Sequence, residues 1–175
     1  MVNKPHALIL TCLLCIFCSV TSGQNIKGHY VARSQEDGTL YYTMPVSLFK
    51  NDKLGDLTFD LTYKQNSKTV TMNFTYLMEQ PTSADSIKII NGSVIISGET
   101  KKIYIEPYKN MWKHRYTLSD SITNFNSFYT EKNASEAIIY AGEKEYRYKV
   151  KKSAWKNYLP IGNKIFQMIE LNEKK

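Results

Sequence analysis

The sequence predicts a mainly β fold, an antiparallel β-sandwich or barrel-like meander with a helical C-terminal segment packed on it. Two observations lead to this class. Apolar and polar residues alternate with period two over much of residues 39–76, and short apolar runs recur between turn residues over residues 86–151. Of the 175 residues, 42% are hydrophobic and 22% are charged, which is enough apolar material for one packed domain.

The first element, residues 1–23, is predicted to be a secretory signal peptide. A short polar start precedes an apolar run over residues 7–20, and small polar residues follow as far as Gly23. A helix over that run would span roughly 21 Å, which is short of a bilayer core of about 30 Å. We favour cleavage after Gly23 over cleavage after Ser22, with an uncleaved anchor as the alternative. Residues 24–175 then form a single β-rich domain with no transmembrane segment.

The three cysteines all lie inside the apolar run of the signal peptide, at Cys12, Cys15 and Cys18. Their removal leaves a domain that cannot form a disulfide, a thiolate metal site or a cysteine nucleophile. An exported domain without disulfides is more typical of bacteria, so we expect a periplasmic, secreted or cell-surface protein. Lipid anchoring at Cys18 is a minor alternative, because Phe17 precedes it where lipoprotein signals carry a small residue.

The first predicted strands are Lys27–Ser34 and residues 39–48. In the second run, Tyr42 shares one face with leucine, methionine and valine residues, whereas Tyr41 points the opposite way. We therefore single out Tyr41 as a candidate binding residue. Pro45 has no N–H group to donate, so this run is an edge strand, or it breaks or bulges at Pro45.

The central prediction is a β-hairpin made by residues 57–64 and 70–76. Both runs alternate strictly, and only a short polar segment over residues 65–67 separates the turn ends of the two strands. One face of the hairpin should be buried and the other should face water.

Shorter strands should follow, joined by turns at residues 91–92, 97–99 and 141–143. Asn91-Gly92 is the strongest of these hairpin signals, because both residues tolerate the positive φ of a tight turn. The predicted strands are Ser86–Ile90, Val94–Ser97, Lys102–Glu106, Met111–Leu118, Ala137–Ala141 and Glu145–Lys151.

Two segments have apolar residues at helical spacing. Ser119–Tyr129 is predicted to be a short helix with Ser119 as its N-cap. The C-terminal apolar stripe over residues 155–169 is expected to be split into two helices by Pro160 and Gly162. Ser153 and Asn163 are the caps expected for those two helices. We expect the stripe to pack on the sheet; the alternative is a groove for a partner.

Motifs of catalysis and cofactor binding are absent from the sequence. His29 and His114 have no metal-ligating residue at a suitable spacing, and no P-loop, GxSxG elbow or EF-hand loop occurs. Asp56 and Asp60 are expected to be solvated carboxylates, although two carboxylates brought together by the fold could act as acid and base. We therefore predict no catalytic residue, no metal ligand and no cofactor, and favour a role other than catalysis.

The most suggestive stretch alternates basic and aromatic residues. Arg147, Lys149 and Lys151 should line one face of a strand, and Tyr146 and Tyr148 the other, in a chain of net charge +7. This predicts a cationic surface for an anionic glycan, a lipid head group or an envelope protein. The alternative is a strand with tyrosines in the core and charges in water. Nucleic acid is disfavoured as a partner, because the aromatic rings do not share the charged face.

The start at Gly28-His29-Tyr30, the β meander and the late helix resemble lipocalin-like barrels. That resemblance implies a closed barrel that carries a small apolar ligand. From the residues themselves we predict an exported, non-catalytic binding domain of the periplasm or cell surface, with an unknown ligand. The alternatives are the lipocalin-like carrier, an envelope inhibitor or interaction protein, and a small hydrolase.

Overall fold

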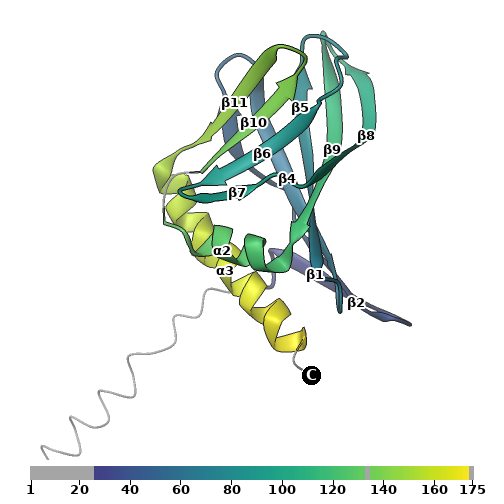
Figure 1. Ribbon diagram of the computed structural model, residues 1–175, viewed down its shortest axis with the longest axis vertical. Helices are drawn as coiled ribbons and strands as arrows, with labels where there is room; N and C mark the ends of the chain where they lie inside the picture. Colours follow the sequence, from purple (N-terminus) through teal and green to yellow (C-terminus); the bar gives the residue numbers. More distant parts are fainter. Residues whose placement is uncertain (1–25, 133–134, 174–175) are drawn as a thin grey trace, which may run out of the picture.

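The computed structural model describes residues 26–132 and 135–173, and these form one curled antiparallel sheet with two helices (Figure 1). The signal peptide prediction falls outside the described residues. The elements are β1 Tyr30–Gln35, β2 Gly38–Thr43, β3 Val46–Asn51, β4 Gly55–Lys64, β5 Thr69–Met78, β6 Ser86–Asn91, β7 Val94–Ile96, β8 Glu99–Tyr108, β9 Met111–Ser121, α2 Ile122–Thr130, β10 Ser135–Ala141, β11 Lys144–Val150 and α3 Lys152–Glu173.

The described strands join into an 11-stranded sheet, most of it in the order β7-β6-β10-β11-β3-β4-β5-β9-β8. β2 pairs with the far end of β4, and β1 pairs with β2. β7 and β8 lie at the two ends of this order, yet only residues 97–98 separate them in the chain. So short a connection forces the two ends of the sheet together, and the sheet curls into a half barrel rather than two stacked sheets. The mainly antiparallel fold with a packed C-terminal helix is confirmed.

The central hairpin is confirmed as β4 and β5, with Phe59 opposite Phe74. Its inward side chains, at alternate positions from residue 57 to residue 76, are all buried. They pack against α3, where the rings of Phe59 and Tyr158 meet edge to face at 5.8 Å. The inside of the half barrel is therefore filled at this level, which gives no support to a carrier of apolar ligands.

Of the three alternatives predicted for Pro45, an edge strand, a break or a bulge, the structure has a break, which separates β2 from β3. Between β2 and β3 the positions whose side chains point inward shift by one residue. Tyr41 and Thr43 point inward, Tyr42 and Met44 are exposed, and Val46 lies opposite the inward Phe59. The pattern in residues 39–48 thus indicated two unlike faces correctly, but the side of β2 that is buried belongs to Tyr41 and not to the more apolar Tyr42 face.

The hairpin turns at Asn91-Gly92 and at residues 141–143 are confirmed, with Gly92 at φ 61° and Gly142 at φ 60°. Residues 97–98 are different, because they carry the chain from one edge of the sheet to the other. A Cβ atom on Gly98 would lie 1.8 Å from the Ser119 carbonyl oxygen. Only glycine allows the chain to cross so close to β9.

The two helices depart from the sequence prediction in their limits. α2 has Ser121 as its N-cap, whose Oγ accepts a hydrogen bond from the Asn124 N–H at 3.1 Å, and Ser119 lies within β9. α3 is one continuous helix, so the predicted split at Pro160 is wrong, and the predicted caps Ser153 and Asn163 lie inside it.

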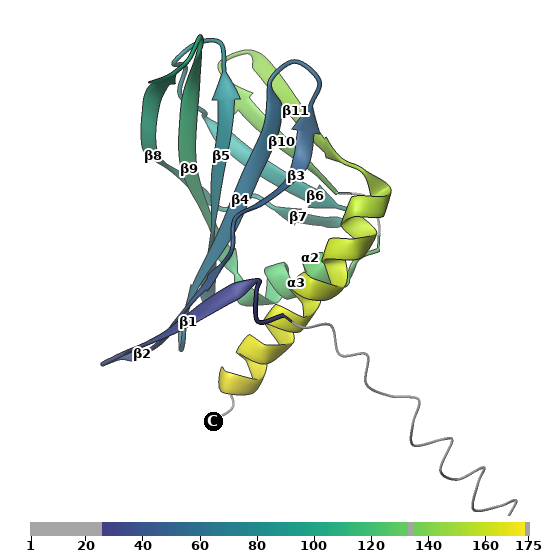
Figure 2. The same cartoon turned by 180° about the vertical axis from the view of Figure 1, so that it is seen from behind.

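Tertiary packing explains why α3 continues through Pro160. Pro160 has no N–H group to bond the carbonyl oxygen of Lys156, four residues earlier, and both residues are exposed. On both sides of Pro160 the helix is anchored to the core, by Trp155 and Tyr158 before it and by Ile165 and Phe166 after it. Figure 2 shows α3 as one rod along the lower end of the sheet, opposite the end where β3, β4, β10 and β11 turn.

Candidate functional site

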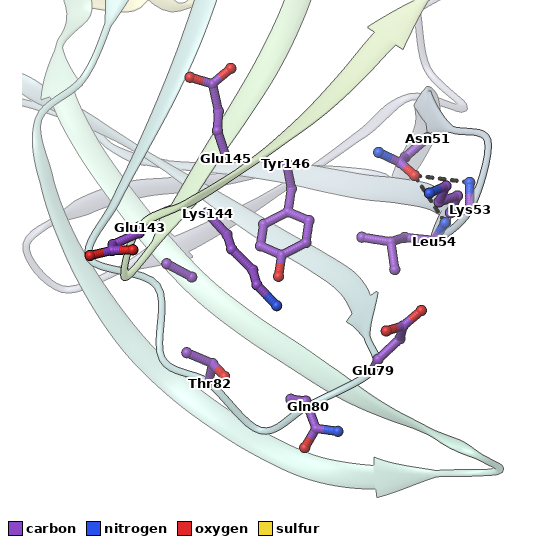
Figure 3. Close-up of a pocket in the computed structure, with 11 residues that line it drawn as sticks. Asn51, Lys53, Leu54, Glu79, Gln80, Thr82, Glu143, Lys144, Glu145 and Tyr146 are labelled. Carbon is purple, nitrogen blue, oxygen red and sulfur yellow. Dashed lines mark hydrogen bonds between the residues drawn. The ribbon is translucent and has the colours of Figure 1, made fainter.

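An open pocket of about 650 Å³ is lined by residues from two hairpin turns and one connection (Figure 3). The two turns, β3–β4 and β10–β11, lie at the end of the half barrel away from α3, which we call the mouth (Figure 1). Three segments line the pocket. They are the β3–β4 turn at residues 51–54, the connection after β5 at residues 79–82, and the β10–β11 turn at residues 141–146. The segments are far apart in the chain, and the strand order brings them to one end.

Side-chain hydrogen bonds to the backbone hold these segments in place. The Asn51 Oδ1 accepts hydrogen bonds from the N–H groups of Lys53 and Leu54, both at 3.0 Å. Its Nδ2 donates to the Arg147 carbonyl oxygen at 2.9 Å, which joins the first turn to β11. The Gly142 N–H donates to Asp85 Oδ2 at 2.7 Å, which joins the third turn to the middle connection. The rim is therefore braced before any ligand arrives.

The polar side chains of the pocket differ in what they already contact. Glu145 points away from the pocket and pairs with Arg147, whereas Lys144 and Tyr146 point into it from β11 (Figure 3). Glu79 reaches the pocket from the connection after β5. Within the described part of the chain, neither Glu79 nor Lys144 has a hydrogen bond or an ion pair through its side chain. Their charges are thus available to a ligand.

Buried aromatic side chains next to the pocket form hydrogen bonds to the backbone of the connection after β5. His114 is fully buried, its ring stacks on Tyr76 at 5.2 Å, and its Nε2 lies 3.2 Å from the Gln80 carbonyl oxygen. Burial lowers the pKa of His114, which favours the neutral ring. A carbonyl oxygen can only accept, so the Nε2–H of His114 donates to it. The Tyr116 hydroxyl accepts a hydrogen bond from the Ala84 N–H at 2.9 Å. These contacts fix both ends of the middle connection.

The three basic residues of the predicted cationic surface lie outside the pocket. Arg147 and Lys149 are exposed on the outer face of β11, and Lys151 is exposed between β11 and α3. Arg147 pairs with Glu145 and, at 3.0 Å, with Glu136; its hydrogen bond to Glu145 raises the pKa of Arg147. Neighbouring carboxylates therefore offset part of the positive charge. The cationic surface stays a prediction.

Tyr41, the fourth predicted site residue, also lies away from the mouth. Its side chain is buried, and its ring is 6.1 Å from that of Tyr63. It borders a hollow of about 10 Å³ between β2 and α3, which is at the lower limit for one water molecule. Its role as a binding residue stays a prediction.

The two aspartates considered for acid–base chemistry are held by separate cations. Asp60 accepts two hydrogen bonds from Arg115 Nη2, at 2.7 and 3.0 Å. Asp56 accepts a hydrogen bond from Ser47 at 2.7 Å, which lowers the pKa of Asp56, and it pairs with Lys50 at 3.3 Å. The fold therefore does not join them into a catalytic pair.

Among residues 26–132 and 135–173, no group of three or more His, Cys, Asp or Glu residues is placed to hold a metal ion. No helix among them has the length and apolar character needed to cross a membrane.

No protein-family model, no curated protein and no solved structure matches the chain.

Sequence reasoning did not find the residues of the pocket. Glu79, Lys144 and Tyr146 all lie at strand ends beside turns, which is the one signal that could have marked them. Many other polar residues share that position. Only the order of strands in the sheet shows which turns meet at the same end.

Proposed function

We propose that the protein is an exported binding protein that holds a small polar ligand in the mouth pocket without converting it. The observation that carries this proposal is an open pocket with a braced rim and with polar side chains that lack partners in the described structure. Its volume of about 650 Å³ is within the usual range for small-molecule sites.

Different features support the proposed export and the proposed non-catalytic role. Residues 1–23 have the pattern of a secretory signal, which supports a periplasmic or cell-surface location. A non-catalytic role is supported by the two aspartates, since each is already tied to a cation on the outer face of the sheet.

The composition of the pocket favours a polar ligand over an apolar one. Apart from Glu145, which points away, its lining includes two glutamates and two lysines, together with Asn51, Gln80 and Thr82. An apolar ligand would remove water from these groups without replacing its hydrogen bonds, which is unfavourable. The apolar interior that could have received such a ligand is filled by side chains of β4, β5 and α3.

Nuclear magnetic resonance of ¹⁵N-labelled protein tests the proposal. A panel of sugars, amino acids, dipeptides, nucleosides and fatty acids is added one class at a time. We expect a polar class to shift the amide signals of residues 51–54, 79–82 and 141–146, and fatty acids to leave them unchanged.

Two results would contradict the proposal. One is the absence of any shift at the mouth at millimolar ligand. The other is a response confined to β11 with a heparin-like oligosaccharide, lost when Arg147, Lys149 and Lys151 are replaced by serine. That second result would instead favour the cationic surface as the binding site.

A further inference from the structure

We infer that the ligand of the mouth pocket is a small zwitterion with a primary ammonium and a carboxylate, such as a free amino acid or short peptide. The inference rests on the proposed function. Its first support is the pair Glu79 and Lys144, which line the same pocket from different segments. They carry opposite charges, yet no ion pair within 4.0 Å joins them.

Opposite charges that face one pocket without meeting can each bind one end of a ligand. A ligand ammonium would bind the Glu79 carboxylate, and a ligand carboxylate would bind the Lys144 ammonium. Charge-assisted hydrogen bonds of this kind are stronger than neutral ones. A ligand with only one charge would leave the other protein group with water alone.

The charge balance of the lining supports the same conclusion. Glu145 pairs with Arg147, so the remaining charged residues are Glu79, Glu143, Lys53 and Lys144, two of each sign. The pocket is thus locally neutral in a chain whose net charge is +7. A neutral lining with separated charges fits a ligand that is itself neutral overall and charged at both ends.

Between the charged groups, the lining offers apolar surface for the carbon atoms of a short ligand. The Tyr146 ring points into the pocket, and Leu54 contributes apolar surface from the β3–β4 turn (Figure 3). An aromatic ring offers a flat apolar surface, and its hydroxyl can donate to a carboxylate. The pocket volume of about 650 Å³ leaves room for a dipeptide.

Blocking each end of the ligand separately tests the inference. The probes are a mixture of free dipeptides, the same mixture N-acetylated, and the same mixture with amidated C-termini, followed by the amide signals of the mouth. We expect free dipeptides to bind and either block to weaken binding by about two- to fivefold, because an exposed ion pair contributes up to about 1 kcal/mol.

Variants assign each end of the ligand to a protein group. Glu79→Gln should weaken binding of free and C-amidated dipeptides but not of N-acetylated ones. Lys144→Gln should weaken binding of free and N-acetylated dipeptides but not of C-amidated ones. Glu99→Gln and Lys101→Gln are the matched controls, because these residues form an exposed ion pair of 3.4 Å on β8 and lie outside the pocket lining.

The outcomes separate this inference from the proposed function. If sugars or nucleosides shift the mouth signals and no dipeptide does, the pocket binds ligands but the zwitterion is wrong. Equal binding of blocked and free dipeptides would also overturn it, as would unchanged binding in both pocket variants. If no compound shifts the mouth signals, the proposed function itself fails.

Discussion

The two ends of the half barrel are built on the same strands, but one is packed with buried aromatic side chains and the other is open and polar. At the end opposite the mouth, which α2 and α3 cover and which we call the closed end, Phe128, Tyr129, Trp155 and Phe166 pack together, each at most 1% exposed. At the mouth, exposed Glu79 and Lys144 line an open pocket. Aromatic packing at the closed end stabilises the fold, whereas the exposed side chains of the mouth contribute little to it and can contact a ligand.

The largest expected effect comes from Trp155→Ala at the closed end. Trp155 is 1% exposed, and its ring contacts those of Phe128, Tyr129 and Tyr158. Its removal should lower the free energy of unfolding by about 3–5 kcal/mol, measured by urea denaturation. Trp155→Phe keeps an aromatic ring and should cost clearly less. A loss below about 1 kcal/mol for Trp155→Ala would contradict the claim that aromatic packing at the closed end stabilises the fold.

A smaller loss is expected for Gly162→Ala in the middle of α3. A Cβ atom there would lie 2.3 Å from Tyr129 Cδ1, so the packed ring would have to move. Alanine favours a helix over glycine by about 1 kcal/mol, but overpacking costs about 1–3 kcal/mol. We expect a net loss in urea denaturation. Gly28→Ala is the control, since no atom lies within 4 Å of its Cβ position, and an equal loss there would reject the packing argument.

His114, which is buried beside the mouth, should make the free energy of unfolding depend on pH. Burial lowers its pKa in the folded protein, so below a pH of about 6.5 the unfolded chain binds the proton more readily. Stability should therefore fall as the pH drops from 7 to 5, by at most about 1.4 kcal/mol per pH unit from this group. Urea midpoints over this range should fall less in His114→Phe than in the parent protein. Equal slopes in the two proteins would contradict the prediction.

The smallest effect on stability is expected at the mouth itself. Glu79→Gln and Lys144→Gln remove exposed charges without a partner in the described structure, so the free energy of unfolding should change by less than about 0.5 kcal/mol. Ligand binding should fall in the same two variants. A large loss of stability would show that these charges support the fold rather than a ligand.

The sequence predicted the local elements well and the orientation of some of them poorly. Strict alternation predicted the central hairpin, because every second residue in a strand faces the same side. The same alternation in residues 39–48 could not say which face is buried, and Tyr41 rather than Tyr42 points inward. Pro160 was expected to end a helix, but packing on both sides of it keeps α3 continuous.

Local sequence patterns are enough to predict the antiparallel strands, the tight turns at Asn91-Gly92 and residues 141–143, and the helical character of the C-terminal stripe. These features depend on residues close together in the chain. The order of the strands, the mouth that this order creates and the pairing of Arg147 with Glu136 are known only from the folded protein. Strand order depends on pairing between distant segments, which local periodicity does not encode.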